Sequence, residues 1–151
     1  MSIVVARSLA DLRDAVNSWR EDGLTHAVVP TMGALHEGHL TLVHEALAKA
    51  DRVMATIFVN PKQFAANEDL SRYPRDEEGD LAKLEGAGCH LAYIPAPDEI
   101  YPPGFVTTIS LGGPAKAGLE DKFRPHFFDG VATVVAKLFI HSAADYAFFG
   151  E

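Results

Sequence analysis

The sequence predicts an α/β fold, a doubly wound and mostly parallel sheet with helices on both faces. Apolar runs of strand length alternate along the chain with segments whose apolar residues recur at helical spacing. This alternation is typical of βαβ units, in which right-handed crossovers join parallel strands. The run at residues 53–59 (VMATIFV) is apolar throughout, as expected of a central strand covered on both faces.

Composition and charge restrict the class of protein. The chain has 151 residues, of which 48% are hydrophobic and 23% charged, as in one ordinary globular domain. A formal net charge of −8 and scattered basic residues argue against a nucleic-acid-binding surface. A single cysteine, Cys89, excludes an internal disulfide and favours a reducing compartment. With no signal-peptide pattern and no apolar run of membrane-spanning length, we expect a cytoplasmic protein without a membrane partner.

The first part of the chain is expected to form two strands and two helices. Residues 3–6 are the first predicted strand, and Ser8 is expected to cap a helix that ends at Gly23. The second strand is predicted at residues 27–29, and the helix after it is expected to end near Ala50.

The strand at residues 53–59 ends before Pro61, which cannot continue a ladder. A charged helix with Leu81 and Leu84 on its inner face follows, and then a strand at residues 91–94.

The last part of the chain contains an alternating segment, an apolar helix and a final strand. Phe105, Thr107, Ile109 and Leu111 would share one face of the alternating segment, residues 105–111. The helix is predicted around residues 131–139 and the strand at residues 146–149, after which the chain stops without a closing helix. We therefore expect residues 1–151 to be an N-terminal domain truncated before its end.

The segment at residues 30–39 (PTMGALHEGH) is the strongest candidate for a functional site. It lies between a predicted strand and a predicted helix, and a helix N-terminus offers free backbone N–H groups and a positive dipole end to phosphate. The imidazoles of His36 and His39 would donate hydrogen bonds to phosphate oxygens, and Gly38 would let a nucleotide approach the helix. The alternative is purely structural, with His36 capping a turn and His39 half-exposed.

A zinc site at the two histidines is disfavoured. Glu37 should point to another face of the helix, so a third ligand is lacking, and the order H-E-G-H differs from the H-E-x-x-H zinc pattern. The loops at residues 30–39, 60–64 and 150–151 each follow a predicted strand. In parallel sheets ligands bind beyond the carboxyl ends of strands, so these loops are expected to form one site.

His36-Glu37-Gly38-His39 resembles the HxGH element of the nucleotidyltransferase superfamily, which has a Rossmann-like fold and is related to class I aminoacyl-tRNA synthetases. The surrounding words, in order, resemble the pantoate–β-alanine ligase family from Ala27 onward. These words are PTMGAL at residues 30–35, FVNPKQF at 58–64, YPR at 73–75 and FGE at 149–151.

This resemblance implies an ATP-dependent ligation in two steps. The carboxylate of pantoate attacks the α-phosphate of Mg-ATP, which gives pantoyl adenylate and pyrophosphate. The amine of β-alanine then attacks the acyl carbon, which gives pantothenate and AMP. Because the substrate supplies the nucleophile, the enzyme has to position groups and stabilise charge. The resemblance also implies a homodimer through this domain, with residues 105–111 as our candidate interface strand.

The resemblance assigns roles residue by residue. His39 is the family's active-site residue, and His36 is expected to act with it. Gln63 would bind pantoate and later β-alanine in a pocket with Asn60, Tyr73 and Met32. The ATP-binding residues would be Met32, Gly33, Ala34, Leu35, His36, Glu37, Gly38 and His39, followed at the end of the chain by Gly150 and Glu151.

Magnesium and two departures from the family pattern complete the expectations. Asp80 falls where some members have a magnesium ligand, but Gly79 replaces a second one, so we expect Mg²⁺ to arrive on ATP. The family reads Arg-Pro-x-His-Phe-x-Gly-Val where residues 124–131 are RPHFFDGV, so His126 is shifted and Phe127 replaces an imidazole. Asp121 also stands where glycine is usual.

The family continues with a lysine and a C-terminal Ser/Arg phosphate clamp that this chain lacks, so we expect binding with little turnover. Two alternatives stay open. One is another HxGH adenylyltransferase, of the phosphopantetheine or nicotinamide-mononucleotide type. The other is a non-catalytic binding and dimerisation module.

Overall fold

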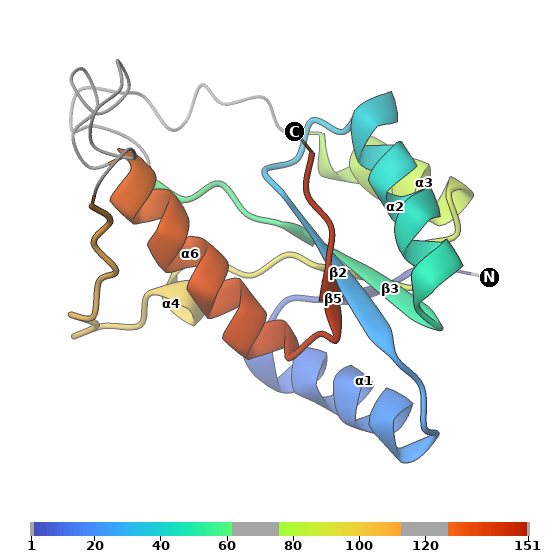
Figure 1. Ribbon diagram of the computed structural model, residues 1–151, viewed down its shortest axis with the longest axis horizontal. Coiled ribbons are helices and arrows are strands. Elements are labelled where there is room, and N and C mark those ends of the chain that lie inside the picture. The colour runs from blue at the N-terminus through green and yellow to red at the C-terminus, as the bar shows by residue number, and fades with distance from the viewer. Residues whose placement is uncertain (1, 62–75, 113–126, 151) are drawn as a thin grey trace.

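Five parallel strands form one sheet in the order β1-β4-β3-β2-β5 (Figure 1). The structure is a computed structural model that describes residues 2–61, 76–112 and 127–150. The strands are β1 (Val4–Ala6), β2 (His26–Thr31), β3 (Arg52–Ile57), β4 (Leu91–Tyr93) and β5 (Tyr146–Ala147). The helices are α1 (Leu9–Glu21), α2 (Glu37–Lys49), α3 (Glu77–Gly86), α4 (Pro97–Ile100) and α6 (Phe127–Ser142).

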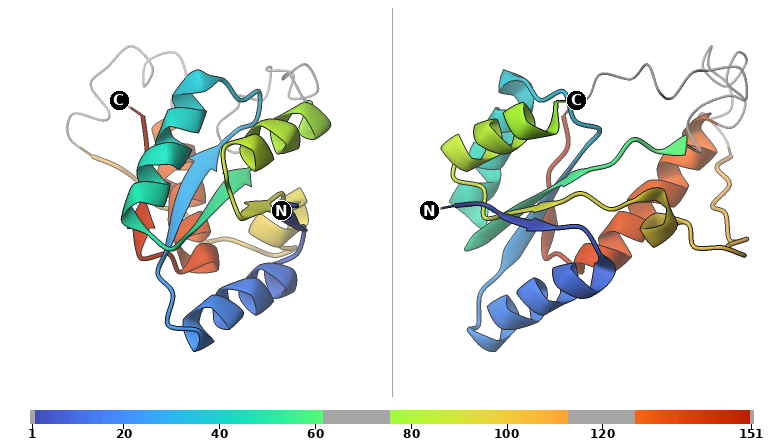
Figure 2. Two further views of the ribbon diagram at one scale, coloured as in Figure 1. Left: turned by 90° about the vertical axis from the view of Figure 1, so that its right-hand side faces the viewer. Right: turned by 180° about the vertical axis from the view of Figure 1, so that it is seen from behind.

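Helices cover both faces of the sheet, so the predicted doubly wound architecture is confirmed (Figures 1 and 2). α2 and α3 lie on one face, where Val29, Val43 and Leu84 belong to one buried apolar cluster. α1 and α6 lie on the other face, where Leu12 and Leu138 belong to a second cluster. Adjacent residues of β2 and β3 point to opposite clusters, which explains why both faces of the middle of each strand are apolar.

The strand order reverses at β2. From β2 the chain passes through α2, β3 and α3 to β4, and it then returns through α6 to β5 on the other side of β2. In open α/β sheets the ligand crevice lies beyond the carboxyl ends of the strands at such a switch point. The segments that follow β2 and β5 are therefore placed where sheets of this kind bind ligands.

β2 is longer than the sequence predicted and contains Pro30. The carbonyls of His26 and Val28 accept hydrogen bonds from the β5 side, whereas that of Thr31 accepts one from Phe58 after β3. By this alternation the missing N–H of Pro30 faces the β5 side, where pairing has already stopped at Val28. Pro30 has no N–H with which to continue the ladder toward β5, and that pairing ends just before it, whereas the pairing with β3 continues through Thr31.

The other helices and strands agree with the predictions apart from their ends. Ser8 caps α1 by accepting the N–H of Asp11 at 3.1 Å, and Gly23, at φ +73°, follows the helix end. β3 and β5 each end two residues earlier than predicted, and α6 begins earlier and ends later than residues 131–139.

The predicted interface strand at residues 105–111 is wrong as secondary structure. The structure gives this segment no strand pairing, because side chains of α6 take its backbone donors instead. Ile109 N–H donates to Thr133 Oγ1 at 3.0 Å, and Leu111 N–H donates to Asp129 Oδ1 at 2.8 Å. Val106 is 87% exposed.

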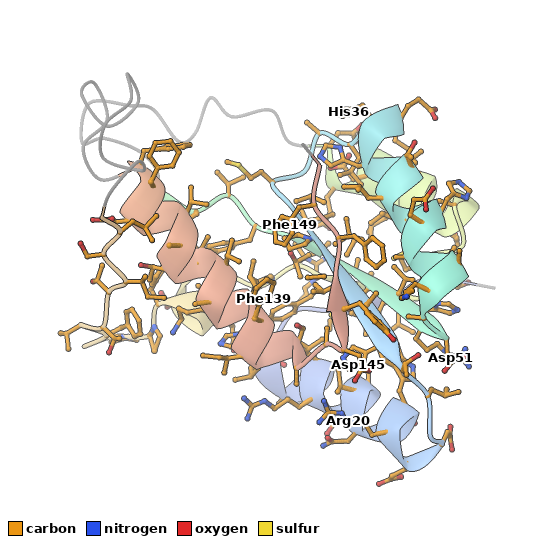
Figure 3. The ribbon with its side chains drawn as sticks, in the orientation of Figure 1. Arg20, His36, Asp51, Phe139, Asp145 and Phe149 are labelled. Carbon is orange, nitrogen blue, oxygen red and sulfur yellow. The ribbon has the colours of Figure 1, made fainter. Side chains whose placement is uncertain are left out.

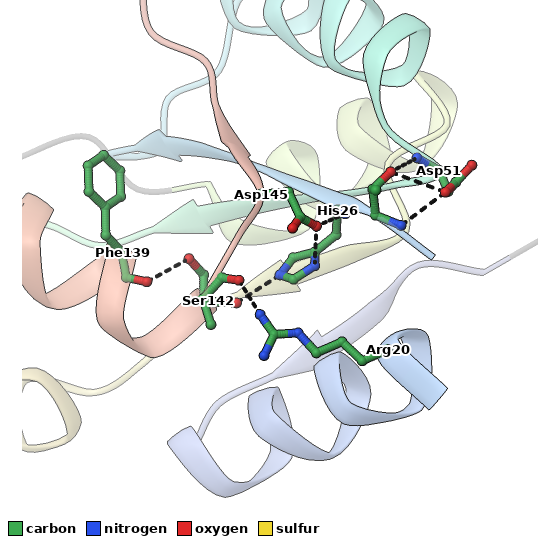
Figure 4. Close-up of polar contacts among 8 residues, drawn as sticks. Arg20, His26, Asp51, Phe139, Ser142 and Asp145 are labelled. Atoms are coloured by element: carbon green, nitrogen blue, oxygen red, sulfur yellow. Dashed lines mark hydrogen bonds and ion pairs between the residues drawn. The ribbon is translucent and has the colours of Figure 1, made fainter. Parts of the chain in front are cut away.

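Polar contacts fix the turn from α6 into β5 (Figure 4). The Asp145 carboxylate accepts the N–H of His26, and the N–H of Asp145 donates to the carbonyl of His26, both at 2.9 Å. The buried ring of His26 contacts the Ser142 carbonyl through Nε2 at 2.8 Å, and Arg20 donates to Ala143. Within the described residues, no helix combines the length and apolar character needed to cross a membrane.

Candidate functional site

The loop between β2 and α2 has an unusual backbone that α3 holds in place. Gly33 and Ala34 both have positive φ, at +85° and +52°. The buried Asp80 carboxylate accepts the N–H of Ala34 at 3.0 Å and that of Leu35 at 2.9 Å. Lys83 Nζ donates to the carbonyl of Leu35 at 2.9 Å. The sequence had suggested Asp80 only as a metal ligand, so these loop contacts were missed.

His36 and His39 cap the start of α2 reciprocally. His36 Nδ1 accepts the N–H of Gly38 at 3.0 Å, and His39 Nδ1 accepts the N–H of His36 at 3.2 Å. The ring centroids lie 4.2 Å apart, and Figure 3 shows His36 at the N-terminal end of α2. Because each Nδ1 accepts a hydrogen bond, each neutral ring carries its proton on Nε2. The pair therefore has two Nε2–H groups left as donors.

Burial lowers the pKa of His39, and the neighbouring His36 lowers it further, while the charge of Asp80 acts in the opposite direction. A neutral His39 keeps its Nδ1 acceptor, so the depressed pKa and the cap support the same protonation state. His39 is thus suited to donate a hydrogen bond as a neutral imidazole.

The backbone of the loop corrects one prediction. The sequence suggested free N–H groups for a phosphate, but five of the loop's N–H groups already have partners within the protein, those of Gly33, Ala34, Leu35, His36 and Gly38. An anion at this loop would therefore depend on the histidine Nε2–H groups rather than on these N–H groups.

The structure gives a reason for the glycine at position 38 that differs from the predicted approach of a nucleotide. A Cβ at Gly38 would lie 2.7 Å from His36 Cε1 and 3.0 Å from His36 Nδ1. The glycine is therefore needed to let the His36 ring fold back over the helix start, independently of any nucleotide.

Two hollows lie on either side of the loop. One, of about 340 Å³, is lined by Pro30, Thr31, Met32, Gly33, Ala34, His36 and His39. The other, of about 150 Å³, also contacts Met32 and Gly33. The rest of its lining comes from the end of β3 and the residues after it, from the start of α3 with its cap Asp76, and from residues 94–97. The structure thus brings Met32, Gly33, Ala34, His36 and His39 together, as predicted, whereas Leu35 points into the core and Glu37 is exposed.

Asn60 is buried and cross-links two elements. Its Nδ2 donates to the carbonyl of Gly130 in α6 at 2.9 Å, and its Oδ1 accepts the hydroxyl of Tyr101 at 2.7 Å. The sequence placed Asn60 in a substrate pocket, and the structure shows it joining the end of β3 to the start of α6. Burial raises the pKa of Tyr101 to about 12, so its hydroxyl stays protonated as the donor.

Other predicted site residues lie at the same edge or outside the described part. The chain end follows β5 toward this edge of the sheet (Figure 1), and the role of Gly150 in nucleotide binding stays a prediction. Gln63, Tyr73, Asp121, His126 and Glu151 lie outside the described residues.

The described residues contain no cluster of side chains dedicated to binding magnesium. No group of three or more His, Cys, Asp or Glu side chains there could hold a metal ion. The carboxylate of Asp80, the suggested ligand, already accepts two backbone N–H groups, and Gly79 lies beside Asp76, where a Cβ would clash with the carboxylate that caps α3. These residues do not form a magnesium site.

A family model described as pantoate-beta-alanine ligase matches residues 4–151. The pantothenate synthetase of Chelativorans sp. (strain BNC1) is 57% identical over 151 residues, which cover 100% of this chain and 53% of that protein. The pantothenate synthetase of Rhodospirillum rubrum is 55% identical over 150 residues, 99% of this chain and 53% of that protein. The chain spans about half the length of these relatives.

Solved structures give the same result. A pantothenate synthetase from Thermus thermophilus superposes with a TM-score of 0.90 at 46% identity, covering 99% of this chain and 52% of that one. A pantoate-beta-alanine ligase from Francisella tularensis, in complex with beta-gamma ATP and β-alanine, has a TM-score of 0.89 at 32% identity, covering 97% and 56%. The resemblance drawn from the HxGH element and its surrounding words is confirmed, and the chain belongs to the pantoate–β-alanine ligase family.

Proposed function

We propose that this chain supplies the ATP and pantoate site of an enzyme that condenses pantoate with β-alanine. A pantoate carboxylate oxygen attacks the α-phosphorus of ATP, the bond to the bridging oxygen breaks, and pyrophosphate leaves. The β-alanine nitrogen then attacks the acyl carbon of pantoyl adenylate, AMP leaves, and the nitrogen loses its proton to form the amide.

The observation that carries this proposal is the reciprocal histidine cap at the switch point. His36 and His39 leave two Nε2–H donors beside the hollow that follows β2. Donors held in advance stabilise charge that develops on phosphate oxygens without having to reorganise. The Francisella tularensis relative, solved with ATP and β-alanine, supports these substrates.

Mg²⁺ is proposed to arrive on ATP and to keep most of its water ligands, as its coordination preference allows. Gln63, with Asn60, Met32 and Tyr73, is proposed to hold pantoate and then β-alanine, because an amide can both donate to a carboxylate and accept from an amine. Gly150 and Glu151 are proposed to begin the adenine and ribose side. A cytoplasmic location is also proposed. Cys89 is a free and buried thiol, as suits a reducing compartment, and burial raises its pKa to about 11.

Calorimetry tests the nucleotide site. The 151-residue chain is titrated with Mg-ATP, as are His36→Ala, His39→Ala and a control, His44→Ala, at an exposed residue of α2. Loss of one hydrogen bond to a charged phosphate should weaken binding about tenfold or more in the first two variants. Equal affinity in all four proteins would contradict the assignment.

Titration with pantoate and with phosphopantetheine then separates the alternatives. We expect pantoate to bind and Gln63→Ala to abolish that binding. Binding of phosphopantetheine alone would favour another HxGH adenylyltransferase, and binding of neither compound would favour a non-catalytic module. We also expect pantothenate and AMP production by this chain to be negligible, which a coupled assay for AMP checks.

A further inference from the structure

Three hydrogen bonds from α3 hold the peptide groups that precede the histidine pair. Asp80, which is 2% exposed, accepts the N–H groups of Ala34 and Leu35 with its two oxygens. Lys83, one turn further along α3, donates to the carbonyl of Leu35. Both polar groups of Leu35 are thereby bound to one helix, and its side chain is buried in the cluster below.

The loop needs such support because its backbone is strained. Ala34 has a φ of +52°, a left-handed conformation that is unfavourable for an L-residue with a side chain. Gly33 before it is also left-handed, and a Cβ there would lie 3.2 Å from Asp80 Oδ2 and 3.3 Å from Ile57 Cγ2. The Asp80 carboxylate therefore packs closely against Gly33, where a residue with a side chain would be strained and crowded.

The supported peptide leads directly into the cap of α2. Leu35 is followed by His36, whose ring is exposed and whose N–H donates to His39 Nδ1. Because the His36 ring is exposed and its contacts are with Gly38 and His39 of the same helix start, its position follows from the backbone that carries it. A shift at Leu35 would move the His36 N–H and would release His39 as well.

We propose that Asp80 and Lys83 are positioning residues that fix the His36–His39 pair, and through it the affinity for the triphosphate of ATP. The role in ATP binding rests on the function proposed above. Asp80 then serves as an acceptor for backbone N–H groups where the family resemblance suggested a metal ligand.

The test compares four variants of the 151-residue chain with the unmodified chain. Asp80→Asn keeps the shape but turns one acceptor into a donor, and Lys83→Met removes the ammonium group but keeps the stem. Lys83→Arg retains a donor for the Leu35 carbonyl. Glu78→Gln removes one negative charge from an exposed position of the same helix and is the matched control.

Two measurements without nucleotide test the positioning. We expect hydrogen exchange at the Ala34 and Leu35 amides to accelerate about tenfold in Asp80→Asn. We expect the ¹⁵N shifts of both rings to show one Nε2–H tautomer in the unmodified chain and a mixture of tautomers in Asp80→Asn and Lys83→Met. Lys83→Arg and Glu78→Gln should keep the single tautomer, which a merely destabilised helix would not explain.

Calorimetry with Mg-ATP tests the consequence. Asp80→Asn and Lys83→Met should bind about tenfold more weakly, and the other two variants should bind like the unmodified chain. The proposal is overturned if the ring tautomers do not change in Asp80→Asn. It is also overturned if ATP binds the unmodified chain, Asp80→Asn and Lys83→Met equally. If the tautomers change but no protein binds ATP, the positioning stands and the proposed nucleotide function fails. If Asp80→Asn does not fold, the Lys83→Met and Lys83→Arg pair decides, since Lys83 is exposed.

Discussion

The imidazoles of His36 and His39 act as hydrogen-bond acceptors toward their own backbone. A helix start normally uses Ser, Thr, Asp or Asn for this purpose, with Glu or Gln three residues later. Histidine in both positions satisfies the same N–H groups while retaining a donor on the far ring nitrogen. One structural motif thus leaves two groups available for chemistry.

The depressed pKa of His39 predicts that acid destabilises the chain. When the folded pKa of a histidine lies below its ordinary value of about 6.5, the unfolded state binds more protons in the window between the two values. The contribution to stability is therefore complete above about pH 6.5 and is lost as pH falls through the folded pKa. His90 and His141, whose pKa burial also lowers, act in the same direction.

His39→Gln isolates the contribution of His39 to the pH dependence of stability, because glutamine can still accept the His36 N–H but does not titrate. Thermal unfolding midpoints measured from pH 7.5 to about pH 5 should fall less in His39→Gln than in the unmodified chain. Parallel curves for the two proteins would show that His39 contributes nothing to the pH dependence.

At the scale of elements, the site depends on links between segments far apart in the sequence. α3 holds the loop after β2, and Asn60 joins the end of β3 to the start of α6. The periodicity of the chain predicted the helices and most of the strands because burial on one or both faces leaves a pattern in the sequence. Side-chain contacts to irregular backbone leave no such pattern, so Asp80 was suggested only as a metal ligand and Lys83 was not singled out.

The same reasoning explains the error at residues 105–111. Alternating residues suggest a strand, but a strand needs a neighbour with free backbone groups. Here Thr133 and Asp129 of α6 take the N–H groups of Ile109 and Leu111. The resemblance, in contrast, identified the histidine pair because its motif is contiguous in the sequence.

Asn60→Ala is expected to destabilise the chain by about 2 kcal/mol. It removes two hydrogen bonds from a buried region, one to the carbonyl of Gly130 and one from the hydroxyl of Tyr101, and each such bond contributes about 0.5–1.5 kcal/mol. Denaturant unfolding gives the free energy of unfolding. Asn17→Ala, at an exposed position of α1, is the matched control. A loss no greater than that of Asn17→Ala would mean that Asn60 supports only substrate.

On the scale of the whole molecule, exposed apolar side chains lie on α6, on or just after β5, and in the segment at residues 105–111. Phe139 and Phe149 contact each other with ring centroids 6.0 Å apart, and both are labelled in Figure 3. The exposed members of this surface are Val106, Ile109, Phe139, Ile140, Tyr146 and Phe149. Exposed apolar groups are candidates for an interaction surface, and we propose that they contribute to the homodimer that the family resemblance implies.

Sedimentation tests that homodimer. The chain should sediment as a dimer at micromolar concentration, and Val106→Lys should shift it toward monomer by placing a charge at the most exposed apolar residue of the surface. Val4→Lys, on β1 at the opposite edge of the sheet, should leave the dimer intact. A monomeric unmodified chain would remove both the homodimer and the proposed role of residues 105–111.

The reciprocal cap has a further consequence for selectivity. Transition metals and acylating reagents need an imidazole nitrogen with an available lone pair. In both rings the lone pair of Nδ1 is engaged by a backbone N–H, and Nε2 carries the proton. Two adjacent histidines at an exposed helix start are therefore expected to be poor chelators, which titration with Ni²⁺ would check against the exposed His44. The same cap that leaves the proposed phosphate donors available is thus expected to weaken the binding of metal ions to these rings.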